Sequence, residues 1–388
     1  MSLLITMKVK NKPVTLIKSE LFRQGGLEKY SWQIAADFCA IGSSVTVLTT
    51  GKPLPPFAHP LLNVVSLPVR CHLSFLNILS FDKACSEYLA RAPTPIIFSL
   101  DRNRFQTHIR AGNGVHAAYL KRRSQEEGVV KQLSFALNPL HRAILSLEKK
   151  AFEHTGLKTL FTNSEMVKQE ILQFYRTDPK KIQVVHNGVE WEAMQSAFDL
   201  WETQRKKILT ELQLDSEALQ FLFIGHNFRR KGLEKLLQAL ALIKHEYFQL
   251  SVIGKDKNLT YYQDLIQKLG LSKKVFIFGP QKETARFYQI ADCIVIPSLY
   301  DPFANVTVEA LAMGVFVLSS KNNGGHEVLT ERNGHVIECL DDPEAFAETL
   351  KMALSRPKSK DSAASIRQSV KHLDFSNQLR LITQSSIS

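Results

Sequence analysis

Residues 221–254 read FLFIGHNFRRKGLEKLLQALALIKHEYFQLSVIG and contain a complete strand–helix–strand pattern. The apolar run FLFIG comes first, an amphipathic segment of helical length follows from about Lys231 to Lys244, and the apolar run QLSVIG ends the stretch. Parallel strands need such a helical crossover, because the chain must return to the starting edge of the sheet. The stretch therefore predicts a βαβ unit.

The same alternation continues through the second half of the chain. Further apolar runs, each followed by a loop or a helix-length segment, lie at 275–279, 293–297, 315–319 and 335–338. The helix after the run at 335–338 is expected to begin at Asp342 and Pro343. Six consecutive units of this kind predict a parallel sheet covered by helices on both faces.

The first half shows a noisier version of this pattern. Its apolar runs lie at 14–17, 45–49, 96–100, 159–163 and 182–188. We therefore predict an α/β protein with two doubly wound, Rossmann-like domains that face a cleft, since ligands bind outside the carboxyl ends of such strands.

The 388 residues exceed what one hydrophobic core usually serves. A polar, helix-prone stretch near 190–217 separates the two patterns. We expect one domain at 1–195 and a second at 196–369, with a last helix within 370–388 available to pack back on the first.

The composition points to an anionic partner. A net charge of +12 favours nucleic acid, anionic lipid or a phosphorylated small molecule, although a generally basic surface is an equally simple explanation. No run of 18 apolar residues predicts a membrane span, and the first residues are too polar for a signal peptide, so we expect a cytoplasmic protein. The five cysteines are scattered without a CxxC pair, which favours reduced thiols and no metal site.

The segment YDPFANVTVEALAMG, 300–314, follows an apolar run directly. Its helical part is apolar nearly all round, which predicts a buried helix that contains Glu309. A carboxylate in such surroundings needs a partner, either a structural cation or the hydroxyl groups of a ligand.

Asp301 lies in the loop before this helix. It has two readings: a helix cap, which an Asp-Pro pair often forms, or a ligand-binding carboxylate. We also expect free backbone N–H groups at the helix start to form an anion site for a diphosphate. These groups belong to Phe303, Ala304 and Asn305.

This segment resembles the acidic signature of the retaining GT-B glycosyltransferases of family four, the glycosyl transferases of group 1. The resemblance implies that Glu309 binds the ribose of a nucleotide and that Asp301 binds hydroxyl groups of the donor sugar. The family usually has glutamate at the first position, so the shorter Asp301 leaves the sugar open.

A second motif places Arg229, Arg230 and Lys231 in the loop after the run 221–225. Guanidinium and ammonium groups suit a pyrophosphate, whereas a solvated basic loop is the plain alternative. The resemblance assigns Lys231 and one of the two arginines to the diphosphate. Many relatives have arginine directly after the strand glycine, where this chain has His226.

Several glycines follow predicted strands. Gly25 and Gly26 form an ordinary tight turn or, by the resemblance, a close approach to the donor. The loops at Gly254 and at Gly279 are expected to complete the nucleotide pocket. His116, in RAGNGVHAAYLKRR, is either structural or a contact to the donor sugar.

The resemblance covers most of the chain, is closest to the bacterial lipopolysaccharide core glucosyltransferases, and implies transfer of a hexose from UDP-glucose or a similar donor. The sequence contains no Asp-x-Asp motif of the kind that binds a metal, and we expect no cofactor. Because no nucleophile is evident, we expect same-face attack on the anomeric carbon, with Lys231, Arg230, Asp301 and His116 as the catalytic candidates.

The acceptor is expected to be a glycolipid or saccharide. The apolar and basic segment 130–150 could lie on an anionic membrane surface as a peripheral helix, or form a plain core helix. The competing functions are a nucleotide-sugar epimerase of the same fold and a basic nucleic-acid-binding protein, although no motif supports nucleic-acid binding.

Overall fold

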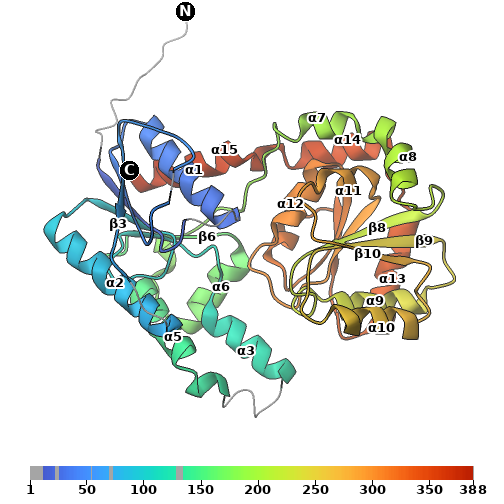
Figure 1. Cartoon of the computed structure of the whole chain (residues 1–388), viewed down its shortest axis with the longest axis horizontal. Coiled ribbons are helices and arrows are strands. Elements are labelled where there is room, and N and C mark those ends of the chain that lie inside the picture. The colour runs from blue at the N-terminus through green and yellow to red at the C-terminus, as the bar shows by residue number, and fades with distance from the viewer. Residues whose placement is uncertain (1–11, 22–25, 54, 70–72, 128–133, 388) are drawn as a thin grey trace, which may run out of the picture. The chain divides into compact units, whose positions relative to one another are not determined.

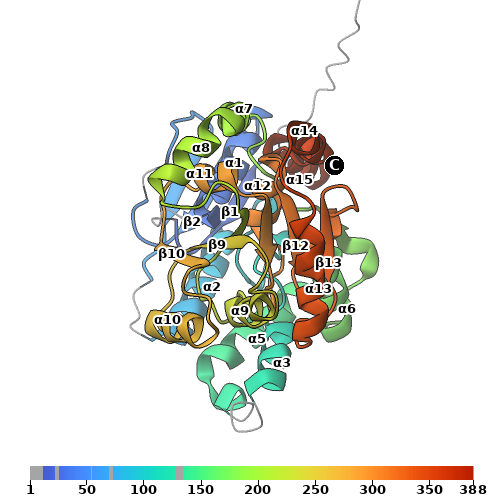
Figure 2. The same ribbon diagram turned by 90° about the vertical axis from the view of Figure 1, so that its right-hand side faces the viewer.

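The computed structural model describes residues 12–21, 26–53, 55–69, 73–127 and 134–387. The chain divides into two compact units, each built on one parallel sheet (Figures 1 and 2). The first unit contains Met1–Val185 together with Leu379–Ser388, and the second contains His186–Gln378. The chain thus crosses from one unit to the other after Val185, whereas the sequence placed the crossing after residue 195.

The first unit holds a seven-stranded sheet in the order β3-β2-β1-β4-β5-β6-β7. Its strands are β1 (Val14–Ile17), β2 (Val45–Thr49), β3 (Leu62–Ser66), β4 (Ile96–Ser99), β5 (His108–Arg110), β6 (Thr159–Thr162) and β7 (Ile182–Val184). All pairs are parallel, and Val14 of β1 lies between Val45 and Ile96. This order is the doubly wound arrangement.

Helices cover both faces of this sheet. They are α1 (Gly26–Ala40), α2 (Ser74–Arg91), α3 (His116–Glu127), α5 (Pro139–Phe152), α6 (Glu165–Phe174) and the 3₁₀ turn η1 (Pro179–Lys181). The end of α15 (Phe375–Ile387) lies beside α1, where Thr383 Oγ1 donates to Asp37 Oδ2 at 2.5 Å.

The second unit has six parallel strands in the order β10-β9-β8-β11-β12-β13. Its strands are β8 (Leu219–Ile224), β9 (Phe248–Ile253), β10 (Val275–Gly279), β11 (Cys293–Ile296), β12 (Phe316–Ser320) and β13 (Gly334–Ile337). All six were predicted from their apolar runs. The central strands carry buried side chains on both faces, as a sheet between two helical layers requires.

The helices of this unit form two layers. They are α7 (Gln195–Asp199), α8 (Trp201–Glu211), α9 (Leu233–Leu242), α10 (Leu259–Lys268), α11 (Ala285–Ile290), α12 (Asn305–Ala312), α13 (Pro343–Leu354) and α14 (Lys360–Ser369), with short turns η2 (Gly324–Val328) and η3 (Lys371–Leu373). The helices α9, α10 and α13 lie on one face, and α11, α12 and α14 on the other (Figure 1). As predicted, α13 begins at Asp342 and Pro343, and Asp342 Oδ1 accepts a hydrogen bond from Ala345 N.

Candidate functional site

The two charged motifs of the second unit follow neighbouring strands. Strand β8 pairs with β11, with Phe221 opposite Cys293, and these are the first and fourth strands of the unit. The strand order reverses at this point, so the loops after β8 and β11 diverge and leave room for a ligand at the carboxyl edge. Arg230 and Lys231 follow β8, and Asp301 follows β11.

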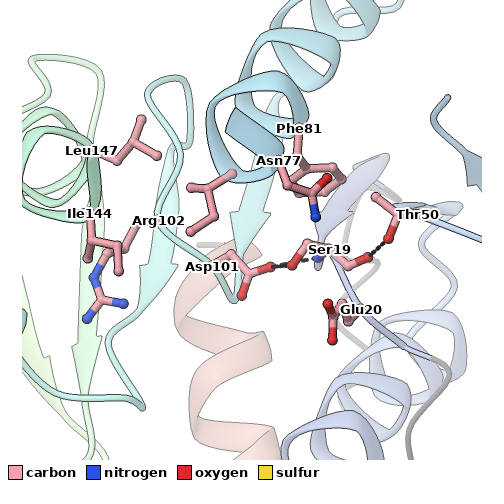
Figure 3. A pocket seen from close by; sticks show the side chains of 10 residues that line it. Ser19, Glu20, Thr50, Asn77, Phe81, Asp101, Arg102, Ile144 and Leu147 are labelled. Atoms are coloured by element: carbon pink, nitrogen blue, oxygen red, sulfur yellow. Dashed lines mark hydrogen bonds between the residues drawn. The ribbon is translucent and has the colours of Figure 1, made fainter. Parts of the chain in front are cut away.

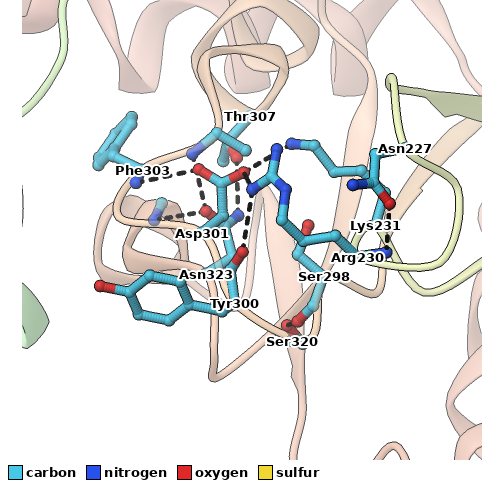
Figure 4. Close-up of polar contacts among 12 residues, drawn as sticks. Asn227, Arg230, Lys231, Ser298, Tyr300, Asp301, Phe303, Thr307, Ser320 and Asn323 are labelled. Atoms are coloured by element: carbon cyan, nitrogen blue, oxygen red, sulfur yellow. Dashed lines mark hydrogen bonds and ion pairs between the residues drawn. The ribbon is translucent and has the colours of Figure 1, made fainter. Parts of the chain in front are cut away.

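Asp301 lies at the centre of this region and binds two cationic side chains (Figure 4). Lys231 Nζ lies 2.7 Å and Arg230 Nη1 3.1 Å from Asp301 Oδ2. Arg230 Nη1 also donates to Tyr300 O at 3.1 Å. Because Asp301 is only 7% exposed, its charge depends on such partners. Three residues from two predicted motifs therefore form one ion cluster.

The ion cluster retains donors for a ligand. An ammonium has three N–H donors and a guanidinium has five, more than the bonds to Asp301 and Tyr300 use. The side chain of Arg230 is 35% exposed and that of Lys231 is 12% exposed. An oxyanion at this edge would therefore meet two positive charges that the protein already holds in place.

The loop that carries these cations has an unusual backbone. Asn227 has φ +60° and Gly232 has φ +76°. A Cβ atom on Gly232 would lie 1.8 Å from Pro297 O, so only glycine fits at this point. Leu299 N donates to Arg230 O at 2.9 Å, which ties the loop to the segment after β11. The close backbone approach sets the position of Lys231 relative to Asp301.

The start of α12 corrects one expectation about the anion site. The amides of Phe303 and Ala304 are not free: Phe303 N donates to Asp301 Oδ1 at 3.3 Å, and Ala304 N donates to Asn323 Oδ1 at 2.8 Å. Side chains that accept from nearby amides replace the expected ligand. The third residue of this set, Asn305, is the first of α12, and its Oδ1 accepts from Asn187 Nδ2 at 2.7 Å.

Asn323 was not singled out from the sequence. It is fully buried and lies after β12, where its Nδ2 donates to Thr307 Oγ1 at 3.1 Å and to Ser319 Oγ at 2.9 Å. Its backbone pairs with that of Asp301 in a short parallel bridge. The helix-cap reading of Asp301 is therefore replaced, because Asn323 occupies the amide of the cap residue Ala304.

Glu309 has a protein partner that the sequence did not reveal. Tyr288, on α11, donates from its hydroxyl to Glu309 Oε2 at 2.8 Å. Burial and the Glu309 carboxylate hold the pKa of Tyr288 well above its usual value, so the phenol remains a donor. The helix α12 is mostly buried, as predicted, but Glu309 itself is partly exposed. The hydrogen bond from Tyr288 thus orients the carboxylate of a residue that is partly exposed.

Lys358 forms hydrogen bonds to the backbone near both members of this pair. Its Nζ donates to Tyr288 O at 3.2 Å and to Met313 O at 2.8 Å, at the end of α12. Burial and the nearby Arg205 lower the pKa of Lys358 to about 7, while Asp292 acts in the opposite direction. Lys358 therefore connects the two helices that carry Tyr288 and Glu309.

Two further predicted residues lie at the same edge of the sheet. Gly254 has φ +134°, and a Cβ there would lie 1.8 Å from Gly225 O. Gly279 has φ +69°, with nothing near the place of a Cβ. Gly254 N donates to Gly279 O at 2.9 Å, so the turns after β9 and β10 are joined. For Gly254, the close approach of Gly225 accounts for the glycine without a ligand.

The sequence did not show which of Arg229 and Arg230 is the arginine assigned to the diphosphate. Arg229 is exposed and lies one residue before Arg230, which makes the ion pair with Asp301. His226 is also exposed, and its Nδ1 accepts from Lys255 N at 3.2 Å. Arg230 is therefore the arginine of the ion cluster.

His116 lies in the first unit, at the start of α3. Its ring Nε2 lies 3.1 Å from His141 Nδ1, and its backbone N–H donates to both oxygens of the buried Glu148. Burial and the charge of Arg102 lower the pKa of His116 to about 4, although Glu148 acts in the opposite direction. The ring contact requires at least one neutral imidazole, because two imidazolium ions would both be donors. His116 is thus held by contacts to His141 and Glu148 within the first unit.

The structure describes only one residue of the predicted glycine pair. Gly25 lies outside the described residues, and Gly26 is the first residue of α1. Within the described ranges, no group of three or more His, Cys, Asp or Glu side chains is placed to hold a metal ion. The same part of the chain contains no helix that is long and apolar enough to cross a membrane.

Two family profiles match the chain. Residues 24–192 match the family described as Glycosyltransferase Family 4, and residues 204–371 match Glycosyl transferases group 1. The two matches cover parts of both structural units.

Individual relatives differ in how much of their length is matched. An uncharacterized glycosyltransferase of Methanocaldococcus jannaschii is 28% identical to this chain over 50% of its residues. The chain spans only about half the length of that relative. The lipopolysaccharide glucosyltransferase WaaG of Escherichia coli is 23% identical over 86% of this chain and 87% of the relative. The second match thus includes both units.

Solved structures extend the similarity to the whole fold. A crystal structure of WaaG aligns with a TM-score of 0.75 at 20% identity and covers 96% of this chain and 99% of that chain. HepE of Anabaena, solved in complex with UDP and glucose, aligns with a TM-score of 0.65 at 14% identity and covers 96% and 99%. The two parallel sheets of this chain therefore form the GT-B fold.

Proposed function

Because the chain belongs to the family four glycosyltransferases, the glycosyl transferases of group 1, we propose that it transfers a hexose from a UDP-sugar to a glycolipid or saccharide acceptor. Members of this family are retaining enzymes that use nucleotide-sugar donors. The identity of the nucleotide, the sugar and the acceptor belongs to the proposal.

The observation that supports the proposal most strongly is the ion cluster of Asp301, Arg230 and Lys231. Breaking the bond between the anomeric carbon and the diphosphate oxygen leaves negative charge on that oxygen. Cations that are already oriented stabilise such charge without reorganisation. Lys231 and Arg230 are held by Asp301 Oδ2 at 2.7 and 3.1 Å, which orients both cations in advance.

Asp301 has capacity for a second task in the same site. A carboxylate offers about four lone-pair positions, and the protein uses three, for Lys231, Arg230 and Phe303 N. We infer that the fourth accepts a hydroxyl of the donor sugar, as the resemblance implies. Asp301 then links the orientation of the cations to the position of the sugar.

The nucleoside part of the donor is assigned to the α12 region. Glu309 is partly exposed and is oriented by the hydrogen bond from Tyr288, and a carboxylate is a suitable acceptor for ribose hydroxyls. The turns at Gly254 and Gly279 lie at the same sheet edge and are assigned to the nucleotide. His116 is left out of the reaction, because its ring and backbone already have protein partners.

The reaction proceeds by attack of an acceptor hydroxyl on the face of the anomeric carbon that the diphosphate leaves. The new bond joins the acceptor oxygen to the anomeric carbon, and the acceptor proton moves to the departing phosphate oxygen. The charge stabilisation comes from Lys231 and Arg230, so we expect activity to persist in EDTA.

The acceptor is proposed to be a lipopolysaccharide core or a related glycolipid. Support comes from WaaG, a lipopolysaccharide glucosyltransferase that this chain matches over 86% of its length. We assign acceptor binding to the first unit and donor binding to the second.

A thermal-shift experiment tests the donor assignment. The parent protein is heated with UDP, GDP, ADP and their glucose conjugates, and Lys231→Ala and Glu309→Ala are compared with it. Lys235→Ala is the matched control, since Lys235 lies on α9 and pairs with the exposed Asp341. We expect UDP and UDP-sugar to stabilise the parent and the control, and to stabilise the two site variants less.

Two results would contradict the proposal. If no nucleotide stabilises the parent protein, donor binding is wrong. If the protein interconverts UDP-sugars without any acceptor, an epimerase replaces the transferase.

A further inference from the structure

Lys358 closes a ring of hydrogen bonds that contains the pair of Tyr288 and Glu309. Its Nζ donates to Tyr288 O at 3.2 Å and to Met313 O at 2.8 Å. Met313 N donates to Glu309 O at 3.1 Å, and the hydroxyl of Tyr288 donates to Glu309 Oε2 at 2.8 Å. The ammonium of Lys358 is therefore linked to the Glu309 carboxylate through both α11 and α12.

The two carbonyl groups that Lys358 binds lie at the carboxyl ends of these helices. Tyr288 is in the last turn of α11, and Met313 directly follows α12. Carbonyl groups at such ends have no partner within the helix and carry the negative end of its dipole. A hydrogen bond from an ammonium is roughly twice as strong as one from a neutral amine. The positive charge of Lys358 therefore contributes to holding the two helix ends together.

The backbone of Lys358 is fixed by residues outside this hydrogen-bond ring. Its N–H donates to Asp292 Oδ1 at 2.9 Å, and Asp292 Oδ2 accepts from Gln220 N and from Arg205 Nη2, each at 2.8 Å. The Nζ of Lys358 also lies 4.6 Å from the centre of the aromatic ring of Trp201. The ammonium is thus directed at the helix ends by contacts that do not depend on Glu309.

The surroundings of Lys358 differ from those of the buried Lys18 in the first unit. Lys18 Nζ lies 2.8 Å from Asp101 Oδ1, and the other oxygen of Asp101 accepts from Ser19 at the cavity that both residues line (Figure 3). A carboxylate in direct contact offsets the charge of an ammonium. The Nζ of Lys358 has carbonyl groups in that place, which carry only partial charges. Its charge is therefore less fully compensated than that of Lys18.

Several charged and titratable groups lie on the elements that contact Lys358. They are Arg205 on α8, Tyr288 on α11, Asp292 before β11, Glu309 on α12 and Arg367 on α14. Burial of the ammonium and the charge of Arg205 lower the pKa of Lys358 to about 7, and Asp292 acts in the opposite direction. Burial and Glu309 hold the pKa of Tyr288 well above its usual value, and the guanidinium of Arg367 keeps its charge. Lys358 therefore carries its charge below about pH 7 and loses it as the pH rises.

We propose that Lys358 is a positioning residue whose ammonium charge increases the affinity of the second unit for its nucleotide-sugar donor. Through α11 and α12 it holds the carboxylate of Glu309 in the orientation that accepts the ribose hydroxyls, and it does not touch the donor. This proposal rests on the proposed function, because that function assigns the ribose to Glu309. Since the donor binds the charged form more tightly, its affinity falls as the pH rises above about 7, and donor binding in this range takes up protons.

Titration calorimetry with UDP-glucose from pH 6 to 8.5 tests this proposal on the full chain. The diphosphate of UDP-glucose is a diester and releases no proton in this range, so the pH acts on the protein. Lys358→Met removes the charge and keeps a long side chain, whereas Lys358→Arg keeps a charge at every pH used. Lys274→Met is the matched control. Lys274 lies before β10, where its Nζ also donates to a backbone carbonyl, Glu246 O, and lies 4.7 Å from the centre of an aromatic ring, that of Phe248.

We expect the dissociation constant of the parent protein and of the control to rise about threefold to tenfold from pH 6 to 8.5. Lys358→Met should bind at pH 6 as weakly as the parent does at pH 8.5, with a flat profile between. Lys358→Arg should bind more tightly than the parent at pH 8.5. At pH 7.5, calorimetry in buffers of different ionisation enthalpy should show proton uptake by the parent, and this uptake should disappear in Lys358→Arg.

The parent protein by itself can overturn the proposal, whether or not the variants fold. An affinity that does not change with pH, or binding without proton uptake, overturns it. Proton uptake that persists in Lys358→Arg, or a Lys358→Met variant with the pH profile of the parent, does the same. If the parent binds UDP-glucose but shows none of these pH effects, this proposal fails alone; if it binds neither UDP nor UDP-glucose, the proposed function fails and this proposal fails with it.

Discussion

Arg230 and Arg229 are adjacent arginines with different surroundings. The same substitution can therefore be compared at the two positions. Arg230 Nη1 binds both Asp301 and Tyr300 O, whereas Arg229 is exposed on the same loop. Removal of one preorganised charge partner of a developing oxyanion typically lowers kcat by about 10²–10³-fold. We therefore expect Arg230→Ala to lose activity on this scale in a UDP-release assay.

Arg229→Ala serves as the control for the same loop and the same change of charge. It should keep activity within a few-fold of the parent protein. A loss in Arg229→Ala that equals the loss in Arg230→Ala would show that the loop contributes only general positive charge.

The hydroxyl of Tyr288 is a second residue-scale target. Tyr288→Phe removes the 2.8 Å hydrogen bond to Glu309 Oε2 and keeps the buried ring. A hydrogen bond to a charged group contributes about 1.5–3 kcal/mol, so the dissociation constant for UDP should rise roughly tenfold or more. We expect kcat at saturating donor to change little, because Tyr288 orients the ribose contact and does not touch the reacting atoms.

Titration calorimetry with UDP checks this prediction. Tyr247→Phe is a suitable control, since Tyr247 donates to the carboxylate of Asp215 on the exposed surface of the same unit. An unchanged UDP affinity in Tyr288→Phe would separate Tyr288 from the function of Glu309.

The turn into α9 offers a test at the scale of an element. Gly232→Ala adds a Cβ at φ +76° and places it 1.8 Å from Pro297 O. Left-handed strain in a residue with a side chain costs about 1–2 kcal/mol, and the clash adds to it. We expect the free energy of unfolding in urea to fall by more than about 2 kcal/mol, with loss of UDP binding.

Gly270→Ala separates strain from clash. Gly270 has nearly the same φ, +73°, but the nearest atom to its Cβ position is Lys244 Nζ at 3.8 Å. This variant should lose only about 1 kcal/mol, as expected for strain alone. Equal losses in the two variants would mean that Pro297 moves aside without cost.

The elements of the second unit were predictable because each strand is a short apolar run between helix-length segments. Strand β11, which reads CIVI, is buried on both faces and has no competing helical pattern. Strand β5 was missed because it has only three residues, His108 to Arg110, and both ends are polar. Burial of these ends depends on tertiary contacts, such as Arg110 over the ring of Tyr30 at 3.8 Å.

Part of the candidate site was also predictable from the sequence. Asp301, Arg230 and Lys231 could be placed together, because both motifs directly follow predicted strands. Asn323 and Tyr288 could not, since their partners lie on other elements and no local pattern marks them. The occupied amide of Ala304 follows from its long-range contact with Asn323, whereas the amide of Phe303 is occupied by Asp301, two residues earlier.

Acid should weaken the first unit through its buried histidines. The pKa of His116 and that of His108 are lowered from 6.5 to about 4, mainly because burial disfavours the charged ring. An unfolded chain therefore binds more protons than the native one between about pH 6.5 and 4, and the free energy of unfolding falls as the pH drops through this window.

Circular dichroism melting curves from pH 7 to 4 measure this effect. His116→Gln should flatten part of the decline in Tm, whereas His245→Gln, at an exposed position of the second unit, should leave the slope unchanged. A decline of the same slope in His116→Gln would assign the acid sensitivity to other groups.

The net charge of +12 predicts how the whole molecule meets an anionic surface. The segment 130–150 was expected to form either a peripheral membrane helix or a core helix. Within it and at its end, α5 buries Ala143, Leu147 and Phe152, while Leu137, just before the helix, is 76% exposed. Basic residues near an anionic bilayer contribute about 1 kcal/mol each, and salt screens this attraction beyond about 10 Å at 0.1 M. We therefore expect peripheral binding that is electrostatic in origin.

Sedimentation with vesicles of neutral lipid, alone or with anionic phosphatidylglycerol, measures this binding at several salt concentrations. The protein should pellet with the anionic vesicles at low salt and remain in solution at 0.5 M salt, and neutral vesicles should bind little at any salt. Leu137→Ser should weaken binding only slightly, because one side chain is a small part of an attraction spread over many charges. Binding to neutral vesicles that resists high salt would instead mean that apolar insertion dominates, and Leu137→Ser would then abolish it.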